Sequence, residues 1–413
     1  MLPRIVVTGM GIVSAAGVGT EPLRTVLQQG QSCVHRIEDL AASTLPCTFG
    51  AAAHAFNARD FLTAREAKRL DRSAQLFVAA GHLALNESAL LASEIDSHRI
   101  GVFEGTSLGG LATALAEHNL LLSKGAHFVN PHLLSAAMTG AGGSMLSLLH
   151  RLHGPVMTFS NGSVSSACAI AAGVQQLRLH EIDAAIVGGS EAPLHYPVMA
   201  LFCRAGMLSS RNEAPETACR PFDATRDGVV LGEGGGALVL ERLESAHKRS
   251  AKIFCEILAT AFTSEAYNSV APAPDAAEQT QALQLVLARA QVQPEEIDFI
   301  SAHGTATLLN DRAETLALKQ AFGAHAYKIP ISAMKSMFGH TLGACSALEI
   351  VATIIAMQHE FVPPTINYQS PDPACDLDYV PTHARRHSMQ VALVKNASFG
   401  GKNSAILLRR FAS

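Results

Sequence analysis

Short aliphatic and β-branched runs alternate along the chain with longer Ala- and Leu-rich stretches. Short runs that end at glycines are typical of buried strands, whereas the longer stretches have the composition of helices. This alternation predicts an α/β protein with a buried sheet. The expected strands are Ile5–Thr8, Ile100–Gly105, Ala184–Gly189, Gly236–Glu241, Phe254–Ala261, Phe299–His303, Ile329–Ala333, Ala392–Ala397 and Ala405–Leu408. The expected helices are Ala64–Glu87, Gly142–Leu152, Ala169–His180, Ala276–Ala290, Asp311–Phe322 and Ala344–Gln358.

A charged segment, ESAHKRSAK (residues 244–252), divides the chain. Each part opens with a strand and carries a glycine-flanked, chemically reactive side chain where a strand meets a helix. We therefore expect two similar α/β halves, residues 1–250 and 251–413, rather than two independent domains. Residue identity between the halves is too low to count as a sequence repeat.

Composition narrows the function classes. The net charge of −4 gives no general attraction to nucleic acid or to an anionic membrane, so an acidic partner needs a local basic patch. No apolar stretch reaches the roughly 18 residues of a membrane-spanning helix, and the N-terminal residues predict a strand rather than a signal peptide. The 8 cysteines are widely spaced without a CxxC pair, which argues against a disulfide framework or a zinc site and favours the cytoplasm.

Cys168 is a candidate nucleophile. It lies in SNGSVSSACAIAAG (residues 160–173), among small residues and just before a stretch of high helix propensity. Ser165 and Ser166 suit the cap region, so we expect Cys168 in the first helical turn, where free N–H groups and the helix dipole favour a thiolate. The alternative is a buried core thiol, as most cysteines in apolar surroundings are.

Two histidines follow predicted strands in the second half. His303, in FISAHGTA, stands at the carboxyl end of a strand, the usual edge for chemistry in α/β sheets. His340 follows Lys335 and precedes a helix that contains Glu349. Either histidine alone is more often structural. Together with a cysteine at a helix start, the pair favours thiolate chemistry with stabilisation of a developing oxyanion.

The late segment KNASFGGKN (residues 395–403) predicts a tight turn. Gly400 and Gly401 follow Phe399 and allow backbone N–H groups to point at a ligand. A phosphate-binding loop is the alternative, but the spacing fits neither GxGxxG nor GxxxxGK[ST].

These segments together resemble the elongating β-ketoacyl-acyl-carrier-protein synthases (synthase II) and the related ketosynthase subunits of type II polyketide systems. The resemblance covers essentially the whole chain. It rests on IVVTGMGIVSAAG at the start, EGTSLGGL (104–111), SSACAIAAG (165–173), IVGGSEA (186–192), RPFDATRDGVVLGEGGGALVLE (220–241), AHGTATLLND (302–311), MKSMFGHTLGA (334–344) and the terminal FGG. It implies the thiolase fold: two similar halves in a five-layered α-β-α-β-α stack, usually dimeric, with the site between the halves.

The resemblance also implies roles for individual residues. Cys168 becomes the acylated nucleophile, and His303 and His340 become the pair that promotes decarboxylation and binds the thioester oxygen. Lys335 and Glu349 support the histidines as neighbouring charges.

Further roles concern the substrate. The backbone N–H groups of Cys168 and Phe399 match the oxyanion hole of the family, and Phe399 also matches a gate of the acyl pocket. The residues that match the substrate-binding set are Thr305 and Thr307, which hydrogen-bond the phosphopantetheine arm, Leu108, which lines the acyl pocket, Phe202 and Glu349.

Two departures from the family pattern affect the expected chain-length preference. Ala397 and Ser398 precede Phe399 where relatives usually have an additional aromatic residue, so the gate is expected to move differently. Phe338 replaces a smaller residue and is expected to narrow the approach to His340 or to reshape the pocket.

A basic run supplies a candidate docking surface for the acidic carrier protein. Arg65, Lys68, Arg69 and Arg72 stand at i, i+3, i+4 and i+7 of TAREAKRLDR, which predicts one helix face. Such runs are more often solvated surfaces. In the family, residues that match Arg65, Lys68 and Arg69 meet the carrier protein, and Arg204 is a displaced counterpart of a second basic contact.

The resemblance implies a two-stage Claisen condensation. An acyl group passes to the nucleophile, and malonyl-acyl-carrier protein then loses CO₂ and attacks it, which extends the chain by two carbons. No metal or diffusible cofactor is expected, because the substrates carry their own phosphopantetheine. The expected partners are an acyl carrier protein and either a second copy or a chain-length-factor paralogue, with no nucleic acid and no membrane insertion.

The residues also bear on two other classes of protein with this kind of sequence. A degradative thiolase uses a second cysteine in a late glycine-rich motif, and here that slot reads ASFGG. A non-catalytic chain-length partner typically lacks the nucleophile. With Cys168, His303 and His340 present, the chain is expected to be the active half of any such pair, and a requirement for a sister subunit stays open.

Overall fold

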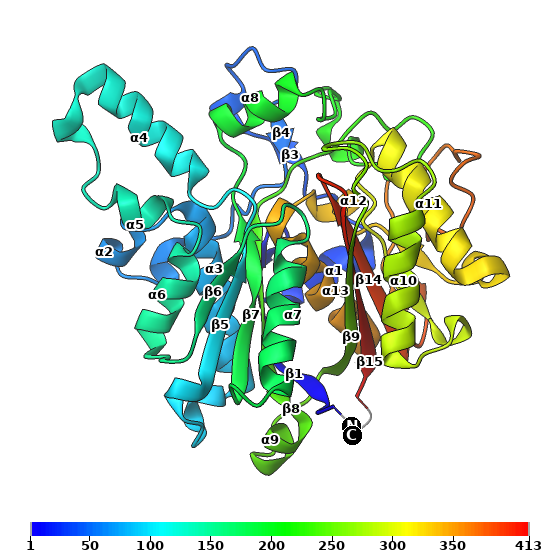
Figure 1. The fold of residues 1–413 in the computed structure, drawn as a ribbon. Coiled ribbons are helices and arrows are strands. Elements are labelled where there is room, and N and C mark those ends of the chain that lie inside the picture. Colours follow the sequence, from blue (N-terminus) through cyan, green and yellow to red (C-terminus); the bar gives the residue numbers. More distant parts are fainter. Residues whose placement is uncertain (1, 412–413) are drawn as a thin grey trace.

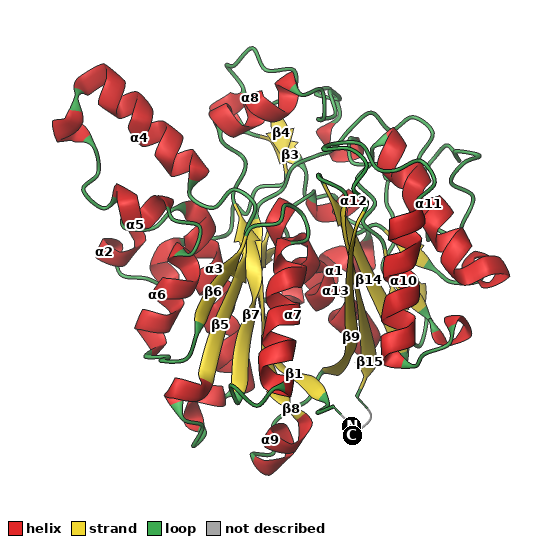
Figure 2. Ribbon diagram, viewed as in Figure 1, coloured by secondary structure: helices red, strands yellow, loops and turns green. Residues whose placement is uncertain are grey.

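The structure is a computed structural model and describes residues 2–411. Helices and strands alternate along the chain, as the hydrophobic pattern predicts (Figure 2). The strands are β1 (Ile5–Ser14), β2 (Gly17–Val18), β3 (His35–Arg36), β4 (Phe49–Gly50), β5 (Ile100–Gly105), β6 (Val156–Phe159), β7 (Ala184–Glu191), β8 (Gly234–Arg242), β9 (Cys255–Ser264), β10 (Phe299–Ser301), β11 (Ile331–Ser332), β12 (Phe361–Val362), β13 (Arg385–Arg386), β14 (Val391–Ser398) and β15 (Lys402–Arg410). The α-helices are α1 (Thr20–Gln29), α2 (Ala64–Ala67), α3 (Arg72–Ser88), α4 (Leu111–Lys124), α5 (Leu133–Ala137), α6 (Ala141–His150), α7 (Ser165–Arg178), α8 (Tyr196–Arg204), α9 (Leu243–Lys248), α10 (Ala277–Ala290), α11 (Leu308–Phe322), α12 (Lys335–Phe338) and α13 (Cys345–Gln358).

The strand order is the same in the two halves of the chain. The first half has the order β6-β5-β7-β8-β1 and the second has β11-β10-β14-β15-β9, so each half, numbered by itself, reads 3-2-4-5-1. The directions also agree: the first three strands of each series are parallel, and the remaining pairs are antiparallel. The prediction of two similar halves is confirmed.

The two series of strands are joined through the β9–β1 pair into one continuous sheet, and the helices form three layers around its two halves (Figure 1). α3 and α6 pack on the outer face of the first half, α10 and α11 cover the second, and α7 and α13 lie between them. In α13 every residue from Cys345 to Met357 is buried, as a helix of a central layer requires. The five-layered stack expected from the resemblance is therefore confirmed.

The two ends of the chain lie close together (Figure 1). Strand β9 pairs with β1 on one side and with β15 on the other, so Ile257 stands opposite both Ile5 and Leu408. Both ends are on the side of the molecule remote from α8 and α11, as Figure 1 shows.

The predicted helix Ala64–Glu87 is wrong, because the chain forms two helices there. Thr63 and Glu66 make a reciprocal capping box at the start of α2, which ends after one turn. Asp71 then caps α3 by accepting a hydrogen bond from the Ser73 N–H at 2.8 Å. The carboxylate begins a second helix, since an Asp at an N-cap satisfies free N–H groups.

Other differences are smaller. β5 has the predicted bounds, whereas β1 and β9 extend further than expected and α7 begins four residues earlier than predicted. The sequence interpretation missed β6, α1, α4, α5 and α8. Within residues 2–411, no helix is both long and apolar enough to cross a bilayer.

A buried ion cluster joins the two halves. Arg226, from the first half, has its Nε 3.2 Å from Asp311 and one terminal nitrogen 2.9 Å from Asp372, both in the second half. The side chains of Arg226 and Asp311 are fully buried, and Asp372 is nearly so. Loss of the guanidinium leaves the buried Asp311 without its counter-charge, while Asp372 keeps only the more exposed Arg312, whose Nε is 3.3 Å away.

We expect Arg226→Met to lower the free energy of unfolding by about 3–5 kcal/mol, because removing one partner of a buried pair leaves an uncompensated charge. Arg385→Met is the matched control, since Arg385 pairs with Asp378 at the surface and such pairs contribute about 0–1 kcal/mol. Urea denaturation followed by circular dichroism measures both. Equal losses in the two variants would contradict the assigned role of the buried cluster.

Candidate active site

A cavity of about 400 Å³ opens between the halves. Its lining includes Ser163, Phe202, His303, Thr305, Thr307, His340 and Phe399. The first half supplies the serine and Phe202, and the second supplies the histidines, the threonines and Phe399. The chemistry-bearing side chains thus come from loops at the sheet edges, as is usual in α/β proteins.

His303 follows β10 and is held through its backbone. Glu314 on α11 accepts the N–H groups of His303 and Gly304 at 2.7 and 2.8 Å. On the ring, Nδ1 lies 3.3 Å from the Lys335 ammonium and 3.4 Å from the Asn396 amide nitrogen. Both neighbours are donors, so we assign Nδ1 as the acceptor and place the proton of the neutral ring on Nε2.

His340 has the same tautomer, but a different contact fixes it. Its Nδ1 accepts the N–H of Leu342 at 3.2 Å, which leaves the proton on Nε2. That Nε2 lies 3.0 Å from the hydroxyl oxygen of Ser163, so the imidazole donates to the serine. The rings of His303 and His340 meet edge to face, with centroids 5.3 Å apart.

Both histidines are neutral near pH 7. Burial lowers the pKa of each imidazole well below 6.5, and the Lys335 ammonium lowers both further. Each ring is thereby kept as a hydrogen-bond donor without charge. Two neutral N–H donors in one buried cavity can stabilise an enolate or a thioester oxygen.

Lys335 and Glu349 lie behind the histidines. The Lys335 ammonium is buried and lies 2.5 Å from Glu349 Oε1, while Asn396 donates to the other carboxylate oxygen at 2.6 Å. Neither charged group lines the cavity. The expectation of Glu349 as a substrate contact is therefore wrong, because its two oxygens are engaged by Lys335 and Asn396 in the interior. Lys335 acts through His303 and is a positioning residue.

Ser163 occupies a tight loop between β6 and α7. Gly162 has a left-handed φ of 62°, and a Cβ there would come within 2.1 Å of Ser398 Oγ. The close approach allows the Ser163 N–H to donate to Ser398 Oγ at 2.9 Å. The end of β14 is thus attached directly to the loop that carries Ser163.

Cys168 lies in the first turn of α7, as the sequence predicts. It is absent from the cavity lining, and its thiol accepts the Asn161 amide at 3.4 Å. Its backbone N–H donates to the Val164 carbonyl at 3.0 Å and is not free to form an oxyanion hole. Burial raises the pKa of Cys168, and the Asn161 hydrogen bond and the Lys402 charge oppose this only in part.

The predicted substrate contacts divide into two groups. Thr305 and Thr307 line the cavity with their hydroxyl oxygens 2.9 Å apart, and Phe202 lines it from α8. Leu108 does not line the cavity; it packs beside Phe202 on a separate apolar cluster, and Glu191 accepts its N–H at 3.1 Å.

The two departures from the family pattern lie in different parts of the structure. Ala397 and Ser398 line the cavity together with the half-exposed Phe399. Phe338 is buried in the main core instead and is not part of the lining. The expectation that Phe338 narrows the approach to His340 is therefore wrong.

The basic run does not form one helix face. Arg65 and Lys68 are exposed at α2, whereas Arg69 is half-buried in the connection to α3. Arg72 points elsewhere and pairs with Glu233 at 2.6 Å. The break at Asp71 accounts for this difference. Arg204 is exposed at the end of α8.

Sequence reasoning missed Ser163, Glu314 and Asn396. The motif SNGSVSSAC contains a usable signal, since its Ser163 follows a glycine between a strand and a helix. Glu314 and Asn396 act on the backbone or on a buried charge, and spacing alone does not reveal this.

The comparisons with known proteins agree with this geometry. Two family models match the chain: "Beta-ketoacyl synthase, N-terminal domain" over residues 3–246 and "Beta-ketoacyl synthase, C-terminal domain" over residues 254–369. A 3-oxoacyl-[acyl-carrier-protein] synthase 2 of Synechocystis sp. is 38% identical over 408 residues, which cover 99% of this chain and 98% of the relative.

Two solved structures have the same fold over their whole length. One is AntDE:AntF, a type II polyketide acyl-carrier protein in complex with its ketosynthase, with a TM-score of 0.92, 30% identity and full coverage of both chains. The other is the ishigamide ketosynthase/chain length factor, with a TM-score of 0.93, 30% identity and full coverage of both chains.

The histidines should make stability depend on pH. Their folded-state pKa values lie below the unfolded value of about 6.5, so between these values the unfolded chain binds more protons. Their contribution to the free energy of unfolding is complete above pH ~6.5 and is lost as the pH falls below this value. As the pH falls, the free energy of unfolding of wild type should decrease more steeply than that of His303→Asn/His340→Asn. We expect the difference in slope to reach about 1.4 kcal/mol per pH unit for each histidine. Urea titrations from pH 8 to 5 measure this, and parallel curves would contradict it.

Proposed function

Because the chain belongs to the β-ketoacyl synthase family, we propose that it joins acyl and malonyl groups carried as thioesters on an acyl carrier protein. The reaction is a decarboxylative Claisen condensation that extends the acyl chain by two carbons. The observation that carries this proposal is the pair of neutral imidazoles, His303 and His340, in one buried cavity.

Decarboxylation of a malonyl thioester produces an enolate, whose oxygen needs donors that are already in place. The Nε2–H groups of His303 and His340 are such donors, and each is worth about 3–4 kcal/mol of transition-state stabilisation in comparable oxyanion holes. Lys335 keeps the His303 proton on Nε2 and disfavours its protonated form. The site therefore needs no proton transfer from either imidazole at the decarboxylation step.

The remaining substrate contacts follow from the lining. Thr305, Thr307 and Phe399 line the cavity, which supports the assignment of the threonines to the phosphopantetheine arm and of Phe399 to the gate. The substrates bring this arm themselves, so the proposal includes no metal and no diffusible cofactor. The eight cysteines are unpaired, which supports a reducing, cytoplasmic location.

We further propose that residues 1–250 and 251–413 act as one catalytic unit. The loop with Ser163 comes from the first part, and both histidines come from the second. His340 is fixed across this boundary, since its backbone N–H donates to the Val230 carbonyl at 2.7 Å.

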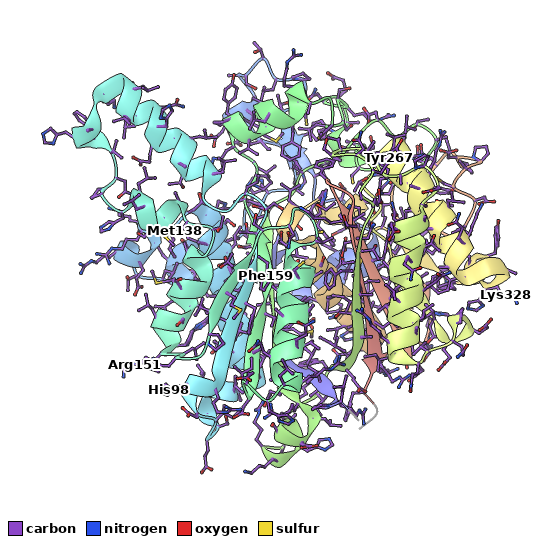
Figure 3. All side chains as sticks on the ribbon, in the orientation of Figure 1. His98, Met138, Arg151, Phe159, Tyr267 and Lys328 are labelled. Atoms are coloured by element: carbon purple, nitrogen blue, oxygen red, sulfur yellow. The ribbon has the colours of Figure 1, made fainter. Side chains whose placement is uncertain are left out.

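A dimer fits the exposed edge of the first half of the sheet. β6 is an edge strand with Val156 and Met157 exposed, and α4 and α5 project beside it with exposed apolar side chains (Figures 1 and 3). These side chains are Leu122, Phe128, Leu134 and Met138. An unpaired edge with adjoining apolar surface is typical of an interface. The similarity to a ketosynthase/chain length factor keeps the second candidate function, a ketosynthase subunit active only with such a partner, beside the homodimer.

Loss of either histidine should abolish most decarboxylation. We expect His303→Ala and His340→Ala each to lower the rate of CO₂ release from malonyl-acyl-carrier protein by about 10²–10³-fold, the usual effect of losing one oxyanion donor. The measurement uses malonyl groups labelled in the carboxylate. His359→Ala, at an exposed histidine on the surface, is the control and should keep the wild-type rate. Native CO₂ release by the double variant would remove the imidazoles from the mechanism.

Charge reversal at α2 should weaken carrier-protein docking. Arg65→Glu/Lys68→Glu should raise KM for carrier-bound substrate several-fold and flatten its dependence on salt, because exposed charges act mainly on association. A pantetheine-thioester surrogate should be turned over unchanged. Lys248→Glu/Lys328→Glu makes the same change in net charge elsewhere, Lys328 being on the far right of Figure 3. An equal loss of activity with the carrier-bound substrate and with the surrogate would mean that α2 serves folding rather than docking.

A further inference from the structure

We propose that Lys395 is a positioning residue for His303, which it holds in place through the carboxylate of Glu314. The inference rests on the proposed function, because it adds a residue to the support of one of the two oxyanion donors. Lys395 is on β14, one residue before Asn396, and is buried without lining the cavity. It supports His303 from the backbone side, whereas Lys335 supports the ring.

The turn after β10 is built around a negative group. The N–H groups of His303 and Gly304 converge on Glu314, whose Oε1 and Oε2 accept them at 2.7 and 2.8 Å. Gly304 has a left-handed φ of 38°, and a Cβ there would come within 2.3 Å of the Ala333 Cβ, so the turn requires glycine. Successive N–H groups in such a turn form a concave site for an anion. The Glu314 carboxylate occupies that site.

Lys395 supplies the counter-charge for this carboxylate. Its ammonium lies 3.2 Å from Glu314 Oε1, the same oxygen that accepts the His303 N–H. The side chains of Lys395 and Glu314 are at most 1% exposed. A buried carboxylate stays charged when a cation is paired with it. Only the charged form offers an acceptor to both N–H groups, since a protonated carboxyl carries a donor O–H.

A second contact fixes the ammonium itself. Lys395 Nζ donates to Gln279 Oε1 at 2.7 Å, and the amide nitrogen of Gln279 donates to Glu265 Oε1 at 3.1 Å. Glu265 thereby determines that the amide oxygen faces Lys395. The other Glu265 oxygen accepts the Ala273 N–H at 2.7 Å, and Gln279 and Glu265 both line the cavity. The ammonium is thus anchored to the cavity wall on one side and paired with the support of His303 on the other.

Stability alone does not account for the buried pair. Removing two charges from water costs about as much free energy as their attraction returns, so an apolar pair of similar volume is often equally stable. What Lys395 and Glu314 specify is a conformation, namely the N–H directions at residues 303 and 304 and hence the direction of the imidazole. A displacement of about 1 Å in a group that acts at the transition state can lower a rate about 10²-fold.

Lys395 also acts on the charge of the ring. Burial lowers the pKa of His303 most, and the charges of Lys335, His340 and Lys395 lower it further. A proton on Nδ1 would face the Lys335 ammonium and the Asn396 amide, which are both donors, so the protonated ring cannot keep its place. Loss of Lys395 should therefore raise the pH below which His303 stops acting as a donor.

The first test is the pH dependence of CO₂ release from malonyl-acyl-carrier protein. We expect Lys395→Met to lower kcat at pH 7 by about 10–10²-fold without changing KM, because no contact with the substrate is lost. The acid limb of its rate profile should move to higher pH. Lys395→Arg keeps the cation and should retain the acid limb of wild type.

Arg249→Met is the matched control. Arg249 pairs with the buried carboxylate of Glu241 at 2.5 Å and directly follows α9, at the end of the molecule away from α8 (Figure 1). This variant also deprives a buried carboxylate of its cation, yet it should keep the wild-type kcat and acid limb. An equal fall of kcat in Arg249→Met and Lys395→Met would reflect a general loss of stability and would overturn the inference.

Lys395→Met/Glu314→Gln carries neither charge and serves if Lys395→Met does not fold. The Gln side chain has a single acceptor oxygen, so one of the two N–H groups loses its partner. The double variant should therefore regain the stability lost in Lys395→Met, measured by urea denaturation, without regaining kcat. Recovery of kcat together with stability would leave the pair a purely structural role and overturn the inference.

Hydrogen exchange measures the positioning without any activity. In Lys395→Met the amides at residues 303 and 304 should exchange at least about 10-fold faster than in Arg249→Met, followed by mass spectrometry of the peptide 299–307. If wild type releases CO₂ while Lys395→Met has wild-type kcat, acid limb and exchange, the inference is overturned and the proposed function stands. If wild type releases no CO₂ while these amides exchange faster in Lys395→Met, the proposed function is overturned and the support of His303 by Lys395 stands.

Discussion

The buried ammonium of Lys335 is the interaction on which the site depends. A charge in this interior is tolerated only because Glu349 neutralises it and Asn396 occupies the second carboxylate oxygen. The same ammonium faces His303 Nδ1, which fixes the tautomer and keeps the ring neutral. One buried cation thereby determines which atom carries the proton and whether the imidazole is charged.

The backbone around the cavity is fixed by carboxylates in a similar way. Glu314 accepts two successive N–H groups at His303 and Gly304, and Glu191 accepts N–H groups from Ser107 and Gly343, which belong to different halves. These loops have no sheet partners of their own, so side-chain acceptors satisfy their polar groups. The site is rigid although its residues come from irregular segments.

Much of the fold was predictable because its signals are local. The run Ile100–Gly105 is apolar except for Glu104 and ends at glycine, so the strand follows from composition. The similarity of the two halves was foreseeable in outline, because each half opens with a strand and carries a glycine-flanked reactive residue where a strand meets a helix. The histidines were predictable as well, since each follows a short strand and stands beside a glycine.

The errors arose where one residue type serves two purposes. Asp71 suits a helix surface and an N-cap equally well, and only tertiary contacts, including the hydroxyl of Thr113 at 2.5 Å, decide for the cap. By contrast, Cys168 lies in the first turn of α7, as its neighbours predicted, because Ser165 begins the helix.

The pairing of β9 with both terminal strands has a consequence for the connectivity of the chain. Adjacent strands are about 4.8 Å apart, so the ends of β1 and β15 are separated by only about 10 Å. A short linker can join them, and the chain can be reopened in the connection between α9 and β9 without breaking a strand pair. The circularly permuted protein would begin with residues 251–413 and end with residues 1–250, and its cavity would be unchanged. The order of the two halves is therefore a property of the chain's covalent path and not of its fold.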